Sequence, residues 1–168
     1  MAERKTQTNV DTSTAEELNL DTKVTVKNIA GWVVGFSRKD GYGDISIAAN
    51  GTMRLSRAEI IAQVQSGNRL FTGLDGMGGH ATLFIDDTPT RIEVEFESED
   101  GKKEQNVFSD ERVKSLFALS QAKFQNEFKE AICTRAEKYA VIDAIKRLKI
   151  NDFGKMRFVE DYTGYKIQ

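Results

Sequence analysis

The chain holds only one histidine and one cysteine, so the side chains most used in acid–base and nucleophilic catalysis are scarce. Cys133 would need a histidine as its base, and His80 is the only one available. The aspartates near His80 also lack the spacing of a recognised metal site. We therefore expect no catalytic residue, no metal and no cofactor, and we assign structural roles to His80 and Cys133. The sequence favours a protein that is not an enzyme.

Residues 73–80 read Gly-Leu-Asp-Gly-Met-Gly-Gly-His and contain four glycines. A Walker-type phosphate loop ends in Gly-Lys-Ser or Gly-Lys-Thr, whereas here His80 and Ala81 come after the last glycine. The stretch instead predicts a flexible connecting loop. Loops of this kind often carry binding residues, so Met77 and His80 are candidates for contact with a partner protein.

A basic cluster near the C-terminus is the candidate for contact with phosphate or with a partner. It consists of Lys146, Arg147, Lys149, Lys155 and Arg157. Aromatic residues lie between these cations, a combination typical of proteins that bind single-stranded nucleic acid. Four acidic residues in the same window weaken the positive field, and lysines at a helix end also complement the helix dipole. Nucleic-acid binding is therefore the alternative rather than the favoured function.

Composition limits the remaining classes. The 168-residue chain has a net charge of −2, which argues against general electrostatic capture of nucleic acid. Residues 1–101 carry a net charge of −6 and residues 102–168 a net charge of +4, so the two parts offer surfaces of opposite charge. A single cysteine cannot form an internal disulfide, and we expect no secretory signal and no membrane partner.

The charge boundary agrees with a change in hydrophobic pattern. Residues 1–21 are polar and predict a flexible N-terminal arm. Residues 22–104 predict a β-rich module with one embedded helix at 56–66, which Ser56 and Glu59 begin as a capping box and Gly67 ends. Short apolar runs predict strands at 24–28, 32–36, 45–47, 53–55, 70–71, 81–86 and 92–97, with a hairpin turn at Asn50 and Gly51.

Residues 105–168 predict a helical C-terminal segment with a short extended end. Ser109 or Asp110 can cap its first helix, and apolar residues come after it at helical spacing. Thr134 and Glu137 form a second capping-box pattern, which indicates a break there, although one continuous helix is also compatible with the sequence. Residues 156–159 predict a short strand. The expected fold class is α+β: a small antiparallel β-sandwich or barrel with one embedded helix, followed by helices.

Residues 27–71 resemble small virion structural proteins of tailed bacteriophages. The likeness lies in Asn-Ile-Ala-Gly-Trp at 28–32, Ile-Ala-Ala-Asn-Gly-Thr at 47–52 and Leu-Ser-Arg-Ala-Glu at 55–59. It covers about a third of the chain, and the helical C-terminal third departs from the simplest such proteins. The resemblance implies a compact β module that binds neighbouring subunits of a phage head or neck, as in a capsid. It also implies a location in the virion after synthesis in the host cytoplasm, and it carries over no catalytic residue.

These observations support two hypotheses. The first is a non-enzymatic structural or assembly protein, an oligomer or part of one, whose partners are other protein subunits. The alternative is an intracellular nucleic-acid-binding accessory protein that uses the basic and aromatic C-terminal segment.

Overall fold

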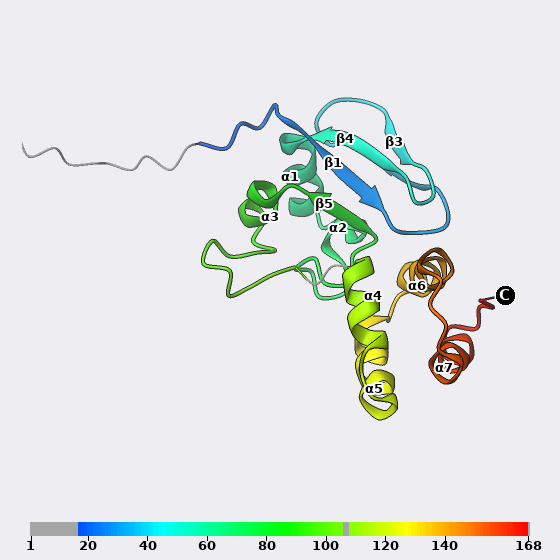
Figure 1. Cartoon of the computed structure of the whole chain (residues 1–168). Coiled ribbons are helices and arrows are strands. Elements are labelled where there is room, and N and C mark those ends of the chain that lie inside the picture. The colour runs from blue at the N-terminus through cyan, green and yellow to red at the C-terminus, as the bar shows by residue number, and fades with distance from the viewer. Residues whose placement is uncertain (1–16, 106–107, 168) are drawn as a thin grey trace, which may run out of the picture.

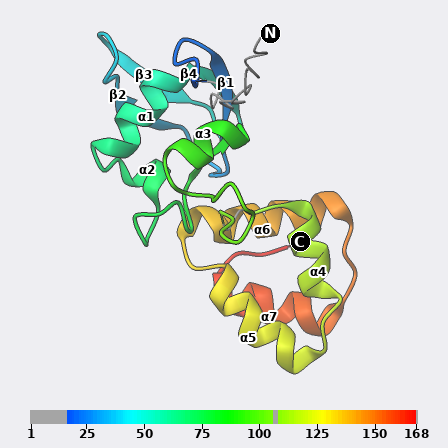
Figure 2. The same cartoon turned by 90° about the vertical axis from the view of Figure 1, so that its left-hand side faces the viewer.

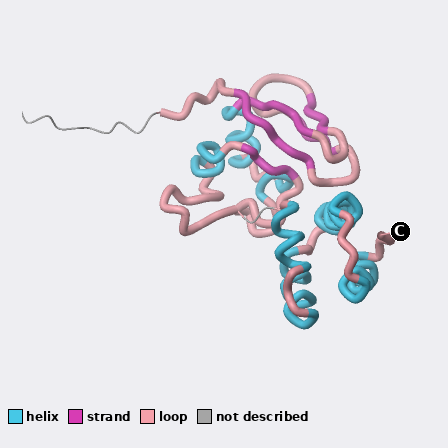
Figure 3. The backbone as a smooth tube through the Cα atoms, in the orientation of Figure 1, coloured by secondary structure: helices cyan, strands magenta, loops and turns pink. Residues whose placement is uncertain are grey.

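The computed structural model describes residues 17–105 and 108–167, which form a mixed α+β fold (Figures 1 and 3). These residues contain seven helices and two small antiparallel sheets. The strands are β1 (Lys23–Asn28), β2 (Val34–Ser37), β3 (Asp44–Ile47), β4 (Thr52–Ser56) and β5 (Leu83–Asp86). The helices are α1 (Arg57–Gln65), α2 (Arg69–Thr72), α3 (Thr88–Glu93), α4 (Asp110–Phe117), α5 (Gln121–Ala131), α6 (Arg135–Leu148) and α7 (Phe153–Thr163).

The expected α+β class is confirmed, whereas the expected sandwich or barrel is not confirmed. The larger sheet has the order β4-β1-β5, and β2 pairs only with β3. No closed barrel exists among the residues that the structure describes. In β1, Val24 and Val26 are buried while Thr25 and Lys27 alternate with them, so one face of this sheet covers the core.

The turn at Asn50 and Gly51 is present, but it joins two strands of different sheets rather than a hairpin pair. Thr52–Ser56 pairs with β1, whereas β3 pairs with β2. The buried side chain of Asn28, at the end of β1, accounts for this arrangement. Its Nδ2 donates to the carbonyl oxygens of Ile47 and Ala48 at 3.2 and 3.1 Å. Asn28 thus holds the end of β3 beside the end of β1, and the chain enters the other sheet after the turn.

The embedded helix is confirmed as α1, and Ser56 is its N-cap. Ser56 Oγ accepts from the Glu59 N–H at 3.1 Å. The second half of the predicted capping box is absent, because the Glu59 carboxylate accepts from the N–H groups of Lys39 and Asp40 instead. Arg57, the first residue of the helix, pairs with Asp87 at 3.0 Å and so ties α1 to the start of α3.

Two predicted strands of the β-rich module are wrong, because their residues lie in helices and turns. Residues 70–71 lie in α2, which begins at an N-cap formed by Asn68. Residues 92–97, expected as a strand, span the end of α3 and a turn in which Glu95 has a φ of 65°. Asp87 caps α3 and Pro89 lies in its first turn, and both favour a helix start. These helix-start signals outweigh the alternation of apolar and acidic residues.

The C-terminal segment is helical as predicted, and Ser109 is the N-cap of α4. The break at Thr134 is confirmed. There Thr134 and Glu137 make both hydrogen bonds of a capping box, and α5 ends at Ala131. The strand predicted at residues 156–159 is wrong. These residues lie in α7, a helix that begins at an N-cap formed by Asp152.

Two hydrophobic cores share one helix, α6. Ala136 and Ala140 belong to the core under the sheets, whereas Val141 and Ile145 belong to the core among α4, α5 and α7. Figure 2 shows α6 lying between the β-rich part and the α5–α7 pair. Gly31 lies so close to the Tyr139 ring of α6 that a Cβ there would overlap it.

The expected N-terminal arm, residues 1–21, lies largely outside the described residues. Its last part contacts α1, since the carbonyl of Leu20 accepts from the Ala58 N–H at 3.0 Å. In the described portions of the chain, no helix is both long and apolar enough to cross a bilayer.

Candidate functional site

The loop at residues 73–80, here called the glycine loop, connects α2 to β5 and is braced by its own hydrogen bonds. Asp75 Oδ1 accepts from the N–H groups of Met77 and Gly79 at 2.8 and 2.9 Å. The Gly78 N–H donates to the carbonyl of Thr72 at 2.8 Å. The sequence predicts a flexible loop, whereas this network fixes its path.

Gly78 shows why the loop needs glycine. Its φ is +86°, a conformation that L-residues other than glycine rarely adopt. A Cβ there would also lie 2.7 Å from the buried ring of Phe96 and 2.9 Å from Gln105 Nε2. The loop backbone therefore packs directly on the core at this point.

Two apolar side chains of the glycine loop face solvent. Leu74 is 66% exposed and Met77 is 39% exposed. The sequence predicts Met77 as a candidate contact, and the structure places it at the surface. Leu74 was missed, although an apolar residue flanked by glycine and aspartate in a loop was the available signal.

His80, the second candidate of this loop, turns towards the helical part instead. Its Nδ1 lies 2.9 and 3.0 Å from the two carboxylate oxygens of Glu137. Glu137 is buried and also accepts from the N–H and hydroxyl of Thr134, so one carboxylate caps α6 and holds His80. This contact links the β-rich part to α6, and no sequence pattern indicated it.

Cys133 lies just before α6, and its environment does not activate it. Its Sγ is within 3.4 Å of the carbonyl of Lys129 and within 3.3 Å of that of Glu130. Partial burial, together with the negative charge of Glu137, raises the pKa of the Cys133 thiol. A thiol with a raised pKa is a weak nucleophile at neutral pH.

The β2–β3 hairpin presents another exposed side chain that the sequence did not indicate, that of Tyr42, which is fully exposed. The buried Glu59 carboxylate accepts from the N–H groups of Lys39 and Asp40 at 2.8 and 2.5 Å, which anchors this hairpin to α1. Burial by itself would raise the pKa of Glu59, but these hydrogen bonds and one from Gln63 outweigh it and lower the pKa.

The structure disperses the predicted basic cluster. Arg147 donates to both carboxylate oxygens of Asp110 at 2.5 and 2.9 Å, so its charge is already paired. Lys155 is buried, and its Nζ donates to the carbonyl of Phe117 at 2.7 Å. Lys146, Lys149 and Arg157 are exposed.

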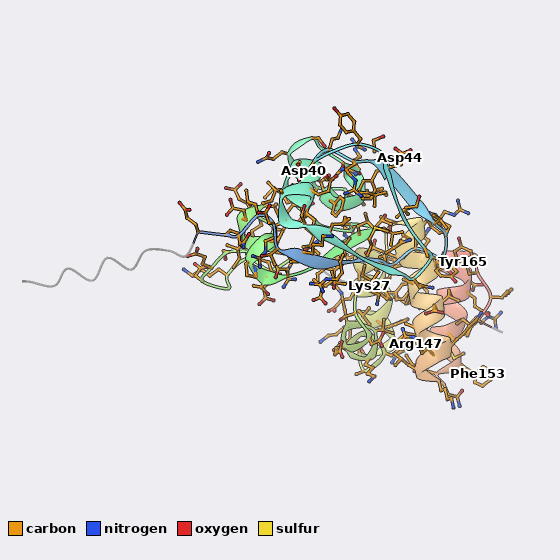
Figure 4. The ribbon with its side chains drawn as sticks, turned by 90° about the horizontal axis from the view of Figure 1, so that it is seen from above. Lys27, Asp40, Asp44, Arg147, Phe153 and Tyr165 are labelled. Atoms are coloured by element: carbon orange, nitrogen blue, oxygen red, sulfur yellow. The ribbon has the colours of Figure 1, made fainter. Side chains whose placement is uncertain are left out.

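The aromatic residues beside these cations are used mostly in packing. The rings of Phe158 and Tyr162 stack on each other with centroids 6.0 Å apart and pack against the helical core. Phe153, by contrast, is 79% exposed at the start of α7. Figure 4 shows Phe153 and Arg147 on the helical part, away from Asp40 and Asp44 of the β2–β3 hairpin.

Over residues 17–105 and 108–167, no group of three or more His, Cys, Asp or Glu side chains is placed to hold a metal ion. Comparisons with models of protein families, with curated proteins and with solved structures find no significant match to this chain.

Proposed function

We propose that this protein is a non-enzymatic structural or assembly protein that binds neighbouring protein subunits through the glycine loop. The observation that carries this proposal is the exposure of Leu74 and Met77 on a loop held by the Asp75 hydrogen bonds. Exposed apolar side chains that are grouped together are typical of contact surfaces, and methionine is enriched in interfaces. Because the loop is already ordered, binding would cost little conformational entropy.

We further propose that the assembly is the particle of a tailed bacteriophage, at its head or neck. The support for this finer statement is the sequence resemblance of residues 27–71. Mass spectrometry of purified particles should detect the chain in fixed stoichiometry with the other virion proteins. A protein that stays monomeric at high concentration and is absent from assembled particles contradicts both the assembly role and the phage location.

The contribution of the loop can be estimated from its exposure. Burying a whole Leu or Met side chain contributes about 1.5–3 kcal/mol. Scaled by the exposed fractions, Leu74 would contribute about 1–2 kcal/mol and Met77 about 0.6–1.2 kcal/mol. The double variant Leu74→Ser/Met77→Ser should therefore weaken subunit association by at least about tenfold.

Sedimentation over a concentration series measures this loss, with Val33→Ser as the matched control. Val33 is 63% exposed but lies outside the glycine loop, before β2. The control should associate like the unchanged chain. Equal weakening by both variants would mean that general surface apolarity, not the loop, drives association.

Nucleic-acid binding, the alternative function, has less support from the geometry. Lys146, Lys149 and Arg157 remain exposed, but Arg147 and Lys155 are occupied within the fold. If the alternative holds, affinity for single-stranded DNA should fall steeply with salt and should drop further in Lys146→Glu/Lys149→Glu.

A further inference from the structure

A groove of about 750 Å³ runs between the larger sheet and the helical part. This volume lies within the range of ligand sites in proteins. The wall formed by the sheet includes Thr25, Lys27, Thr52, Phe84 and Asp86. The wall formed by α4, α6 and the residues before α4 includes Phe108, Asp110, Glu111, Asp143 and Arg147.

The sheet wall is the face opposite the core. Thr25 is paired with Asp86, and Lys27 with both Thr52 and Phe84, across neighbouring strands. Cross-strand partners share a face, and these residues alternate along β1 with the buried valines. The groove thus lies against the second face of the three-stranded sheet, and Phe84 supplies an apolar surface there.

Negatively charged side chains outnumber positively charged ones in the groove. Four carboxylates and two cations line it. Arg147 is held by Asp110 through two hydrogen bonds and lies 3.7 Å from Asp143. Asp86 and Glu111 make no hydrogen bond or ion pair through their side chains with any described residue. The four carboxylates still outnumber the two cations together with Arg54, which pairs with Thr25 across the strands and so shares this face. The groove therefore retains an excess of negative charge.

We propose that this groove binds a short segment of a partner protein that carries apolar side chains flanked by lysine or arginine. The apolar side chains would contact Phe84 and Phe108, which are half-buried, and the cations would pair with Asp86 and Glu111. This proposal extends the assembly function to a second surface, and it uses none of the glycine-loop residues. A negative result for the groove would therefore not affect the proposed contact through the glycine loop. A negative result for the glycine loop would likewise not decide whether the groove binds a peptide.

The probes are three synthetic peptides of equal length with blocked ends, in which leucine alternates with lysine, leucine with glutamate, or serine with lysine. Changes in the amide NMR chemical shifts of the isotopically labelled full chain locate the bound peptide, and fluorescence anisotropy gives its affinity. We expect the leucine–lysine peptide to bind most tightly and to shift residues of β1, β5, α4 and α6. The serine–lysine peptide tests the apolar contribution, and the leucine–glutamate peptide tests the charge.

The key variant is Asp86→Asn/Glu111→Gln, and its matched control is Glu99→Gln/Glu127→Gln, which removes two exposed carboxylates elsewhere. Exposed ion pairs contribute about 0.2–1 kcal/mol each, so the key variant should bind the leucine–lysine peptide about 2- to 30-fold more weakly. The control should bind it unchanged. Thr25→Trp, which fills the groove without changing its charge, should also reduce binding.

Several results would overturn the proposal. Equal loss in the key variant and the control would show that the peptide responds only to net charge. Equal binding of the lysine and glutamate peptides would show that the carboxylates do not select cations. Tighter binding of the glutamate peptide would show that Lys27 and Arg147 govern the groove. Shifts confined to the glycine loop or to α7, or no binding at millimolar peptide, would show that the groove is not the site.

Discussion

Asn28 gives the sharpest test of how the two sheets are held together. Its buried amide donates to the carbonyl of Trp32 at 2.9 Å and to those of Ile47 and Ala48, and it accepts from the Ala30 N–H at 2.9 Å. The two amide hydrogens are shared among three carbonyl acceptors, and Oδ1 accepts one further hydrogen bond. The side chain therefore makes the equivalent of about three hydrogen bonds. At about 1 kcal/mol each, Asn28→Ala should lower the free energy of unfolding by about 3 kcal/mol.

Unfolding in guanidinium chloride, followed by the fluorescence of Trp32, measures this loss of unfolding free energy. Trp32 is the only tryptophan, and its carbonyl accepts a hydrogen bond from Asn28. Asn28→Asp keeps the shape and the acceptor but turns a carboxylate towards three carbonyl oxygens, so it should cost at least as much as alanine. Asn126→Ala, at an exposed position of α5, is the control and should change stability by less than about 0.5 kcal/mol. A loss below about 1 kcal/mol for both Asn28 variants would refute the role of this side chain in joining the sheets.

Three further predictions concern the contacts between elements. Gly31→Ala should cost about 1–3 kcal/mol in chemical denaturation because its Cβ would overlap the Tyr139 ring, and the cost should largely vanish in a Tyr139→Ala background. Burial alone would raise the pKa of Asp87, but its hydrogen bonds to an arginine and a threonine outweigh burial and lower the pKa below its usual range. The carboxylate therefore stabilises the fold above about pH 4, and this stabilisation is lost as the pH falls through the pKa of Asp87 in the folded state. The difference in unfolding free energy between the unchanged chain and Asp87→Asn should therefore shrink in acid. A difference that does not depend on pH would contradict this. His80→Ala and Glu137→Gln should show a coupling of about 0.5–3 kcal/mol in a double-mutant cycle, and simple additivity would mean that the contact contributes nothing.

Local capping chemistry made parts of the fold predictable from sequence. The pattern at Thr134 and Glu137 indicates the start of α6, because both hydrogen bonds of a capping box are short-range and need no tertiary partner. The pattern at Ser56 and Glu59 indicates the start of α1, but only one of its two bonds forms. The Glu59 carboxylate instead binds backbone N–H groups before β3, a contact between residues 19 and 20 positions apart.

Errors arose where a short pattern fits two structures. Ile92, Val94 and Phe96 alternate with glutamates as in a strand, yet the helix start at Asp87 and Pro89 determines the backbone. In the same way, residues 156–159 fit the pattern of a short strand, although Asp152 caps a helix that includes them. Capping residues occur at the boundary of two elements, so a short window does not show which of the two they cap.

The candidate site was predictable only where exposure depends on local sequence. Met77 lies at the surface because the glycine loop folds by short-range hydrogen bonds. The pairing of His80 with Glu137 joins residues 57 positions apart, and the pairing of Arg147 with Asp110 joins residues 37 apart. Such contacts depend on the placement of α6, and no spacing along the chain could have indicated them.

The sharing of α6 makes the two cores thermodynamically dependent on each other. Unfolding the helical part would remove Ala136 and Ala140 from the core under the sheets and would leave the rest of that core, Phe71 and Leu83 included, less well covered. A partner that binds only the native state stabilises whatever unfolds together with its binding surface. A subunit docked on the glycine loop would therefore also protect α5 and α7, which it does not need to touch.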